Sequence, residues 1–446
     1  MIPPFPNPLF LAIVCLPLLA LLFRPFGRHN PMGFRKTIAG FCLLDMILVA
    51  GTWFLDRPDS LCVSCRVFSQ DELLLSLSLL GSMLPFLLID GEDDHRGPRP
   101  GLSLGMLSFA LFGLNLSVPS VPAAGGVLLS GGLWLSALLL SRIFPGAYSG
   151  SFFLRLALAF GLLGLLSGVE GAGLLGADAR EIVAVSAVLL LLPAPFPRKT
   201  ERVSSPAFLR MDQAFFVCIP PLVGFHILKA TGSGTLASPS PALAAACLAF
   251  GFLGLLYGKT ALFTEDLACG LATAGTGFAL AGLLTRTLDG TKGALCLLLL
   301  IPLTTALSGL SLSLLVSRLR VRTFAALAGK GARFGSLRLS FFLGAFQGMS
   351  LPLVGGFLAE WAILKALSEI SFFLAIAAIA GIFFTFVLVL NRTQSLFMGG
   401  VSSGLSSSDE KIAEEITLPE KWSLGMGFAL LLLFDLVLSF MGGSGA

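Results

Sequence analysis

One carboxylate lies within an otherwise apolar stretch of this sequence and is its clearest chemical feature. Glu360 belongs to GGFLAEW, residues 355–361. A charged side chain inside a membrane-spanning segment costs a few kcal/mol or more, and a buried carboxylate avoids that cost by taking up a proton. Glu360 is therefore a candidate proton carrier in an ion path. The alternative is a structural carboxylate that bonds to neighbouring backbone or to Lys365.

Three more ionisable residues are candidates for the same path, and two of them also have a structural interpretation. The three are Lys365, His226 and Lys229. Lys229 ends an apolar segment, where a lysine extends its ammonium group to the membrane surface. His226 lies about one turn from that end, where a satisfied polar residue is the commoner interpretation.

Two aspartates lie in the middle of apolar segments. Asp45 is flanked by Leu44 and Met46, and Asp435 by Phe434 and Leu436. A carboxylate in such a place bonds to a polar group on a neighbouring helix or subunit, or takes part in transport. We interpret both as inter-helix or inter-subunit contacts.

Enzyme chemistry has no recognisable set of residues in this chain. The sequence contains no nucleotide-binding loop, no nucleophile with an adjacent base and no haem-attachment motif. We therefore expect no catalytic residue, no metal site and no cofactor in this chain alone, and no nucleic-acid partner.

The composition predicts a protein whose solvent is lipid. Of the 446 residues 55% are hydrophobic and only 12% are charged, and the mean hydropathy is +0.92. A typical soluble domain has about 25% charged residues. We therefore expect a multi-pass protein of the cell (inner) membrane rather than a soluble enzyme.

The apolar segments predict an all-α polytopic protein with about fourteen transmembrane helices, since each crossing needs about 20 apolar residues. The predicted spans are 8–26, 36–55, 71–90, 101–118, 122–143, 152–175, 182–197, 206–229, 241–258, 266–286, 293–317, 340–367, 371–391 and 422–441. The seventh and twelfth are interrupted by Pro193, Pro195 and Pro197, and by Pro352, Gly355 and Gly356. Broken helices at membrane depth line cavities and mark ion sites in transporters.

The basic residues predict the orientation of these spans. The loops after odd-numbered spans contain twenty Lys and Arg residues and the opposite loops contain six. Because cytoplasmic loops carry the excess of Lys and Arg, we expect both termini outside and the polar stretches 318–338 and 392–421 in the cytoplasm. The loop with Cys62 and Cys65 then lies outside, where a disulfide can form. A metal there lacks two further ligands, because no nearby His or Cys supplies them.

Several stretches carry a family resemblance. They are SFFLGAFQGMSLPLVGGFLAEW at 340–361, ALFTEDLACGLATAGTGF at 261–278, PFP at 195–197 with SPAFL at 205–209 and GFHILK at 224–229, and LNRTQSLFMG at 390–399. Together they resemble the antiporter-like, proton-translocating subunits of respiratory complex I, membrane-bound hydrogenases and multisubunit cation/proton antiporters. Glu360 falls where that family has Lys or Glu in its broken twelfth helix.

The chain also departs from the family at most of the family's charged positions. The family's Glu after Trp134, its seventh-helix Lys, its His after "PF", its eighth-helix Lys and its "KR" are replaced by Leu135, Leu190, Pro197, Pro221 and Ala268-Cys269. Only the carboxylate of the twelfth helix, Glu360, is clearly retained.

The resemblance implies a particular domain organisation. We expect a three-helix region at 1–100 and a first five-helix repeat at 101–230, which contains spans 4–8. A second, inverted repeat at 241–391 contains spans 9–13 and the broken helix 340–367. A cytoplasmic loop and a C-terminal helix follow at 392–446.

The resemblance also implies a function in ion movement. The family implies a membrane-arm subunit of a complex I-like NADH dehydrogenase or hydrogenase of a respiratory chain. Such a subunit moves protons or sodium ions beside sister antiporter-like and redox subunits. The missing charges indicate weak conduction or a structural role. Three alternatives remain: a subunit of a multisubunit sodium/proton antiporter, a non-conducting spacer, or a membrane partner of an enzyme for inorganic-carbon uptake.

Overall fold

The computed structural model divides into two units, which are considered separately. It describes residues 16, 19, 31–55, 70–88, 240–262, 264–319, 321, 323–347, 355–398 and 416–443. The predicted spans between 101 and 229 lie outside these residues. So do the candidate residues Cys62, Cys65, Pro193, Pro195, Pro197, His226, Lys229 and Pro352.

The first unit is described by two helices that pack against each other, α3 (Pro31–Leu55) and α4 (Gln70–Leu88). Ile38, Cys42, Asp45 and Val49 recur at helical spacing and are buried. Cys42 Sγ lies 3.7 Å from the Leu80 carbonyl oxygen, so this side of α3 faces α4. Asp45, the predicted polar contact, therefore lies on a buried side of its helix.

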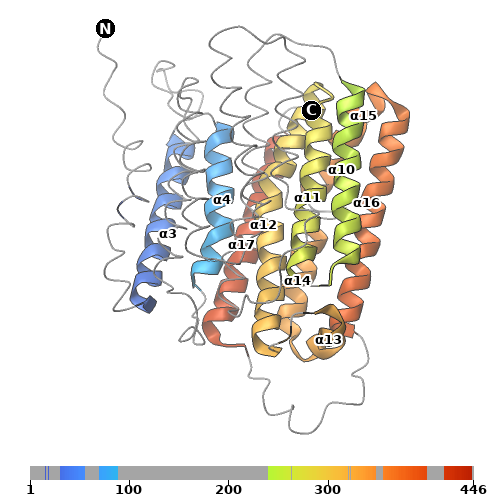
Figure 1. The fold of residues 1–446 in the computed structure, drawn as a ribbon. Coiled ribbons are helices and arrows are strands. Elements are labelled where there is room, and N and C mark those ends of the chain that lie inside the picture. The colour runs from blue at the N-terminus through green and yellow to red at the C-terminus, as the bar shows by residue number, and fades with distance from the viewer. Residues whose placement is uncertain are drawn as a thin grey trace, which may run out of the picture. The chain divides into compact units, whose positions relative to one another are not determined.

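The second unit is a bundle of helices (Figure 1). Its elements are α10 (Pro241–Thr260), α11 (Thr264–Leu283), α12 (Leu288–Leu319), α13 (Phe324–Leu327), the 3₁₀ turn η3 (Lys330–Arg333), α14 (Gly335–Gln347), α15 (Gly355–Ile370), α16 (Phe372–Thr393), the π-helical turn η4 (Gln394–Met398) and α17 (Leu418–Gly443). Every one of these described elements is a helix, as predicted. Four described stretches are long and apolar enough to cross a membrane: Pro241–Thr260, Asp266–Leu283, Leu288–Leu319 and Phe372–Met398.

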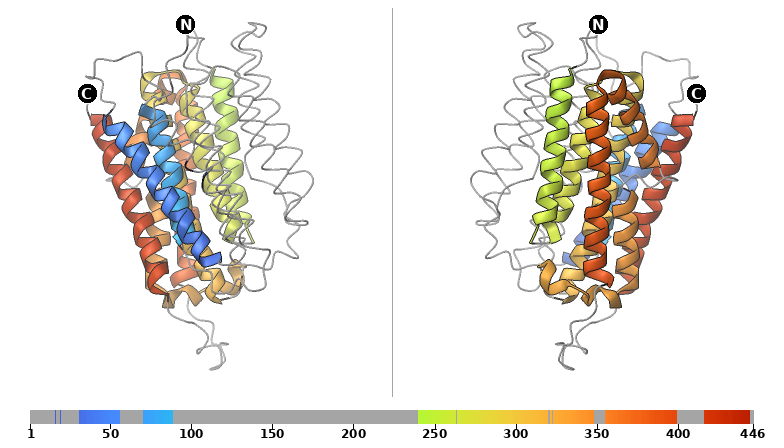
Figure 2. Two further views of the ribbon diagram at one scale, coloured as in Figure 1. Left: turned by 90° about the vertical axis from the view of Figure 1, so that its left-hand side faces the viewer. Right: turned by 90° about the vertical axis from the view of Figure 1, so that its right-hand side faces the viewer.

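The long helix α12 forms the centre of the second unit. It packs against α11, α14, α15 and α17, and every residue from Leu297 to Val316 is buried. A helix that is apolar on all sides belongs in a protein interior. The outer helix α16 exposes Phe372, Phe373 and Phe383 instead, and it lies beside α10 (Figure 2).

Small residues set the spacing between α10 and α11. A Cβ on Gly270 would lie 2.7 Å from the Gly254 carbonyl oxygen, and one on Gly277 would lie 2.8 Å from the Cys247 carbonyl oxygen. Neither position has room for a side chain. The two backbones therefore approach as closely as small residues allow membrane helices to do.

The interruption predicted near 340–367 separates two helices. α14 ends at Gln347 and α15 begins at Gly355. Pro352 belongs to the seven-residue interval 348–354, which lies outside the described residues. The break therefore places Glu360 in the second turn of a new helix.

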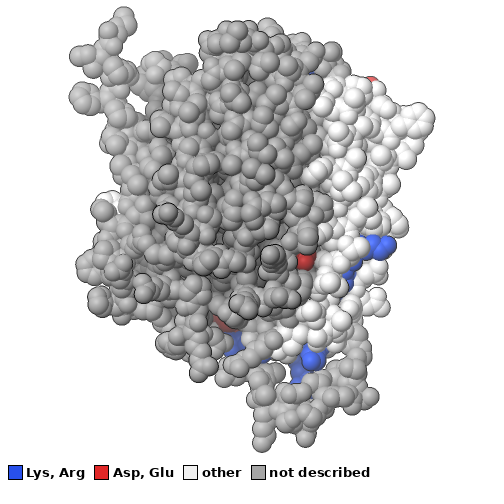
Figure 3. Space-filling view, in the orientation of Figure 1, with Lys and Arg blue, Asp and Glu red and all other residues white. Residues whose placement is uncertain are grey.

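A cluster of basic residues marks one end of the second unit, here called the basic end. It comprises Lys259, Arg318, Lys330, Arg333, Arg338, Arg392 and Lys421. Arg392 donates from Nη2 to the carbonyl oxygens of Gly258, Lys259 and Ala261, and it stacks on Phe324 at 4.3 Å. Gly329, with a φ of 72°, donates its N–H to the Ser395 carbonyl oxygen at 2.9 Å, which joins η3 to η4. In Figure 3 the Lys and Arg atoms of the described surface lie in its lower half.

Candidate ion-translocation site

Glu360 lies on the side of α15 that faces the other helices of the second unit, and its side chain is buried. Its exposed fraction is 8%, whereas the next residue, Trp361, is exposed. α15 packs against α11, α12 and α16, so the side of α15 that carries Glu360 faces the bundle. A glutamate buried in this way lacks the water that solvates surface carboxylates.

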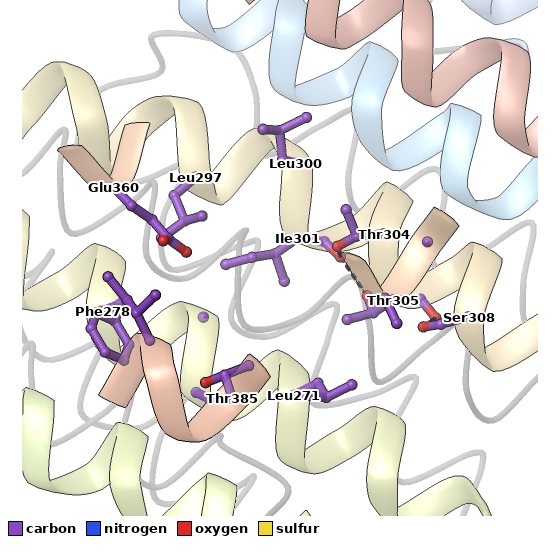
Figure 4. A pocket seen from close by; sticks show the side chains of 15 residues that line it. Leu271, Phe278, Leu297, Leu300, Ile301, Thr304, Thr305, Ser308, Glu360 and Thr385 are labelled. Atoms are coloured by element: carbon purple, nitrogen blue, oxygen red, sulfur yellow. Dashed lines mark hydrogen bonds between the residues drawn. The ribbon is translucent and has the colours of Figure 1, made fainter. Parts of the chain in front are cut away.

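A small cavity adjoins the Glu360 side chain (Figure 4). Its volume is about 40 Å³, which is room for about three water molecules. Residues of α11, α12, α14, α15 and α16 line it, and Glu360 is the only ionisable side chain among the described residues that do so. The cavity lies between helices in the interior of the unit.

Four hydroxyl groups also line the cavity, and each uses its proton within its own helix. The donor–acceptor distances are 3.1 Å from Thr304 to Ile301, 2.5 Å from Thr305 to Ile301, 3.2 Å from Ser308 to Thr305 and 2.9 Å from Thr385 to Gly381, all to backbone carbonyl oxygens. A hydroxyl that donates still has oxygen lone pairs with which to accept. The lining therefore offers acceptors to a water molecule or to a protonated carboxyl group, and not donors to an anion.

The Glu360 carboxyl group is incompletely bonded. Its Oε2 atom is buried and has no hydrogen-bond partner among the described residues. A buried ion without a partner carries a desolvation penalty of several kcal/mol. A neutral, protonated carboxyl that donates to water in the cavity avoids this penalty, so the arrangement suits a group that takes up and releases a proton.

Solved structures of three membrane complexes contain chains with this architecture. A chain of the membrane-bound sulfane sulfur reductase (MBS), an archaeal respiratory membrane complex, matches with a TM-score of 0.72 and 12% identity over 98% of this chain and 94% of that one. A chain of respiratory complex I from Thermus thermophilus with bound NADH matches with a TM-score of 0.69 and 18% identity over 96% of this chain and 95% of that one. A chain of the Mrp complex from Dietzia sp. DQ12-45-1b matches with a TM-score of 0.70 and 14% identity over 96% of each chain.

These matches confirm the resemblance predicted from the sequence stretches. The chain has the antiporter-like subunit fold. The low identities establish the shared fold and leave the activity to be argued from the residues. No protein-family profile and no curated protein sequence matches the chain.

Within the antiporter-like fold, Lys365 lies apart from Glu360. Its Nζ atom is 2.6 Å from Asp289 Oδ2, and the two side chains are 58% and 40% exposed. This pair lies at the end of the second unit opposite the basic end. Lys365 therefore does not satisfy the Glu360 carboxylate, and its part in an ion path stays a prediction.

The predicted polar contacts are both buried. Asp45 is 1% exposed on α3, and Asp435 is 9% exposed on α17. Neither is among the described residues that line the cavity. Their burial is compatible with contacts between helices, the role predicted for them. His226 and Lys229 lie outside the described residues.

The hydroxyl residues are the part of the site that the sequence interpretation missed. Thr304, Thr305 and Ser308 follow Pro302 in the most deeply buried helix, and Thr385 lies in the very apolar α16. A proline inside a helix frees a carbonyl one turn earlier, and hydroxyl residues next to it are a recognisable polar patch. Hydroxyls that bond to their own helix are common in membrane spans, so these residues do not stand out in the sequence.

Proposed function

We propose that this chain is a membrane-arm antiporter-like subunit of a complex I-like respiratory oxidoreductase or hydrogenase of the inner cell membrane. It takes part in proton, or sodium, translocation coupled to electron transfer in other subunits. Redox chemistry, quinone and nucleotide belong to those partners. This chain contributes the path for the ion, with Glu360 as its proton-carrying group.

The observation that supports this proposal most directly is the surroundings of Glu360. The carboxyl group has a buried oxygen without a partner, borders a cavity with room for water, and follows a break in a helix. A structural carboxylate would be expected to have its oxygens bonded. A carboxyl that alternates between two protonation states instead needs neighbours that can rearrange, and water provides them.

Replacement of the carboxyl tests the proposal. The full chain with its accompanying subunits is reconstituted in liposomes, and proton movement is followed with a trapped pH-sensitive dye. Glu360→Gln keeps the shape but cannot release a proton at neutral pH, so we expect translocation to fall at least about a hundredfold, the lower end of the range for loss of a proton-transfer group. Glu369→Gln, an exposed change on the same helix, is the matched control.

Purification from native membrane in mild detergent, followed by mass spectrometry, tests the assembly. Iron–sulfur or hydrogenase subunits that co-migrate support the redox complex. Antiporter-like partners alone support the second candidate, a subunit of a multisubunit sodium/proton antiporter. A chain that migrates alone contradicts both.

One observation favours a third candidate, the non-conducting spacer. Glu360 is the only ionisable side chain among the described residues that line the cavity, whereas a relay commonly has several titratable groups in line. Translocation by the intact complex that is unchanged in Glu360→Gln would support the spacer.

A further inference from the structure

A second buried polar atom without a partner among the described residues lies at the end of α16 that reaches the basic end. Thr393 is 1% exposed, and its Oγ1 atom has no hydrogen-bond partner among the described residues. The buried hydroxyls of Thr273, Thr276, Ser311 and Thr385 each donate to a carbonyl oxygen one turn earlier in their helices. Thr393 therefore differs from the hydroxyls that are satisfied within a helix. A buried hydroxyl left unsatisfied costs about 1–3 kcal/mol, and a water molecule is the usual remedy.

Thr393 lies on the same side of α16 as the cavity residue Thr385. Gly381, Thr385, Val389 and Thr393 recur every four residues and all are buried, so they form one face of the helix. Thr385 borders the cavity next to Glu360. Thr393 is followed directly by the π-helical turn η4, at the end of α16 where Arg392 bonds to the end of α10. One face of α16 thus connects the cavity with the basic end.

The distance along this face is short enough for a chain of waters. Eight residues of helix separate Thr385 from Thr393, which is roughly 12 Å at 1.5 Å per residue. Water molecules at hydrogen-bond spacing cover that distance in about four steps. The π-helical turn η4 (Gln394–Met398) follows Thr393 directly, so the regular α-helical carbonyl bonding changes at that point.

The interval between Thr385 and Thr393 is closed by apolar side chains in this structure. Leu388 and Val389 are buried. On the neighbouring helix α14, Ala345 borders the cavity, and one turn earlier the Phe341 ring packs on Phe397 with centroids 5.7 Å apart. Phe397 belongs to η4, which follows Thr393, so the phenylalanine pair lies toward the basic end of this face. A water chain here therefore forms only transiently, when these side chains move.

We infer that Thr385 and Thr393 are positioning residues for a proton route between Glu360 and the basic end along α16. This inference rests on the proposed function. Glu360 gives its proton to a water in the cavity, and the carboxyl O–H bond breaks as a water O–H bond forms. Each water along the face then accepts one proton and passes one on. Thr393 orients the last waters, and the proton leaves to solvent at the basic end, so no co-reactant is consumed.

The test compares isosteric variants in the same liposome assay. Thr393→Val removes the hydroxyl and keeps the shape, and Thr393→Ser keeps the hydroxyl. We expect Thr393→Val to slow proton movement about tenfold, the rate equivalent of one lost hydrogen bond, and Thr393→Ser to stay near the parent rate. Thr276→Val is the matched control, because Thr276 is buried on α11, bonds the Ala272 carbonyl and is absent from the cavity lining.

A stability measurement separates a water-binding hydroxyl from a dry one. If Thr393 holds no water, Thr393→Val removes an unsatisfied buried group and raises the melting temperature. If Thr393 binds water as inferred, Thr393→Val leaves the melting temperature unchanged or lowers it. A raised melting temperature with an unchanged rate overturns the inference.

The combined outcomes distinguish this inference from the proposed function. Slow transport in both Glu360→Gln and Thr393→Val, with normal transport in Thr276→Val, supports the route. Slow transport in Glu360→Gln alone overturns the route and leaves the proposed function standing. Normal transport in Glu360→Gln overturns both.

Discussion

Two ion pairs of the second unit differ strongly in how far their side chains are buried. Arg318 Nη2 lies 2.5 Å from Glu420 Oε2, and these side chains are only 14% and 5% exposed. Glu420 Oε2 also accepts the backbone N–H of Thr417 at 2.9 Å, just before α17 begins at Leu418. Thr417 and Glu420 thus form half of a capping box. The pair between Lys365 and Asp289 is exposed on both sides.

We expect the loss of the two pairs to have very different consequences. Glu420→Ala removes a buried carboxylate from Arg318 and a cap from α17, so it lowers the free energy of unfolding by about 3 kcal/mol. Lys365→Ala removes a screened surface contact and leaves stability nearly unchanged. Unfolding of both variants in mixed micelles measures the difference. Equal losses in the two variants would contradict the argument.

At the scale of the helices, close backbone packing of α10 on α11 is the most sensitive feature. Gly270→Ala would place its Cβ 2.7 Å from the Gly254 carbonyl oxygen and 2.9 Å from the Gly258 nitrogen. Because these are backbone atoms, the helices must separate. We expect a loss of about 1–3 kcal/mol, measured as a lower melting temperature in detergent.

A second glycine provides the matched control for this prediction. Gly425 lies in α17, and a Cβ there would have nothing within 4 Å. Gly425→Ala restricts the unfolded chain without a clash, so we expect it to be neutral or to stabilise by up to about 1 kcal/mol. A similar loss in both variants would contradict the argument that backbone contact makes the α10–α11 pair sensitive to a Cβ atom.

Hydropathy predicted the long helices well because a membrane crossing requires a minimum apolar length. The spans predicted at 241–258, 266–286 and 371–391 correspond to α10, α11 and α16 within a few residues. The glycines and the proline near 352 also predicted the separation of α14 from α15. The short elements α13, η3 and η4 were not predicted, because they depend on contacts such as Arg392 with the end of α10.

The candidate site was predictable only in part, because it too depends on contacts between helices that are distant in sequence. Glu360 is visible in the sequence because a lone carboxylate in an apolar segment is costly. Its cavity is not visible, because the lining comes from five helices that are distant in sequence. Thr393 illustrates the same limit: its hydroxyl looks like any other until its missing partner is known.

At the scale of the whole molecule, the two ends of the second unit differ in charge. The described residues at the basic end include seven Lys and Arg residues, Lys259, Arg318, Lys330, Arg333, Arg338, Arg392 and Lys421, whereas Arg286, Lys292 and Lys365 belong to the opposite end. The loops that supply the basic end are those predicted to be cytoplasmic. Because the bias is shared by several separate loops, it does not depend on the boundary of any single span.

This asymmetry predicts which end faces the cytoplasm. Lys and Arg near helix ends remain on the cytoplasmic side during insertion, so the basic end should be inside the cell and the Lys292 end outside. We expect Lys292→Cys to react with a membrane-impermeant maleimide in intact cells, and Arg333→Cys to react only after permeabilisation.

Both residues are exposed, so accessibility to the reagent is matched. The variants require a background without the 8 native cysteines. Labelling in the reverse order would invert the topology, and the route from Glu360 along α16 would then lead to the outer face of the membrane.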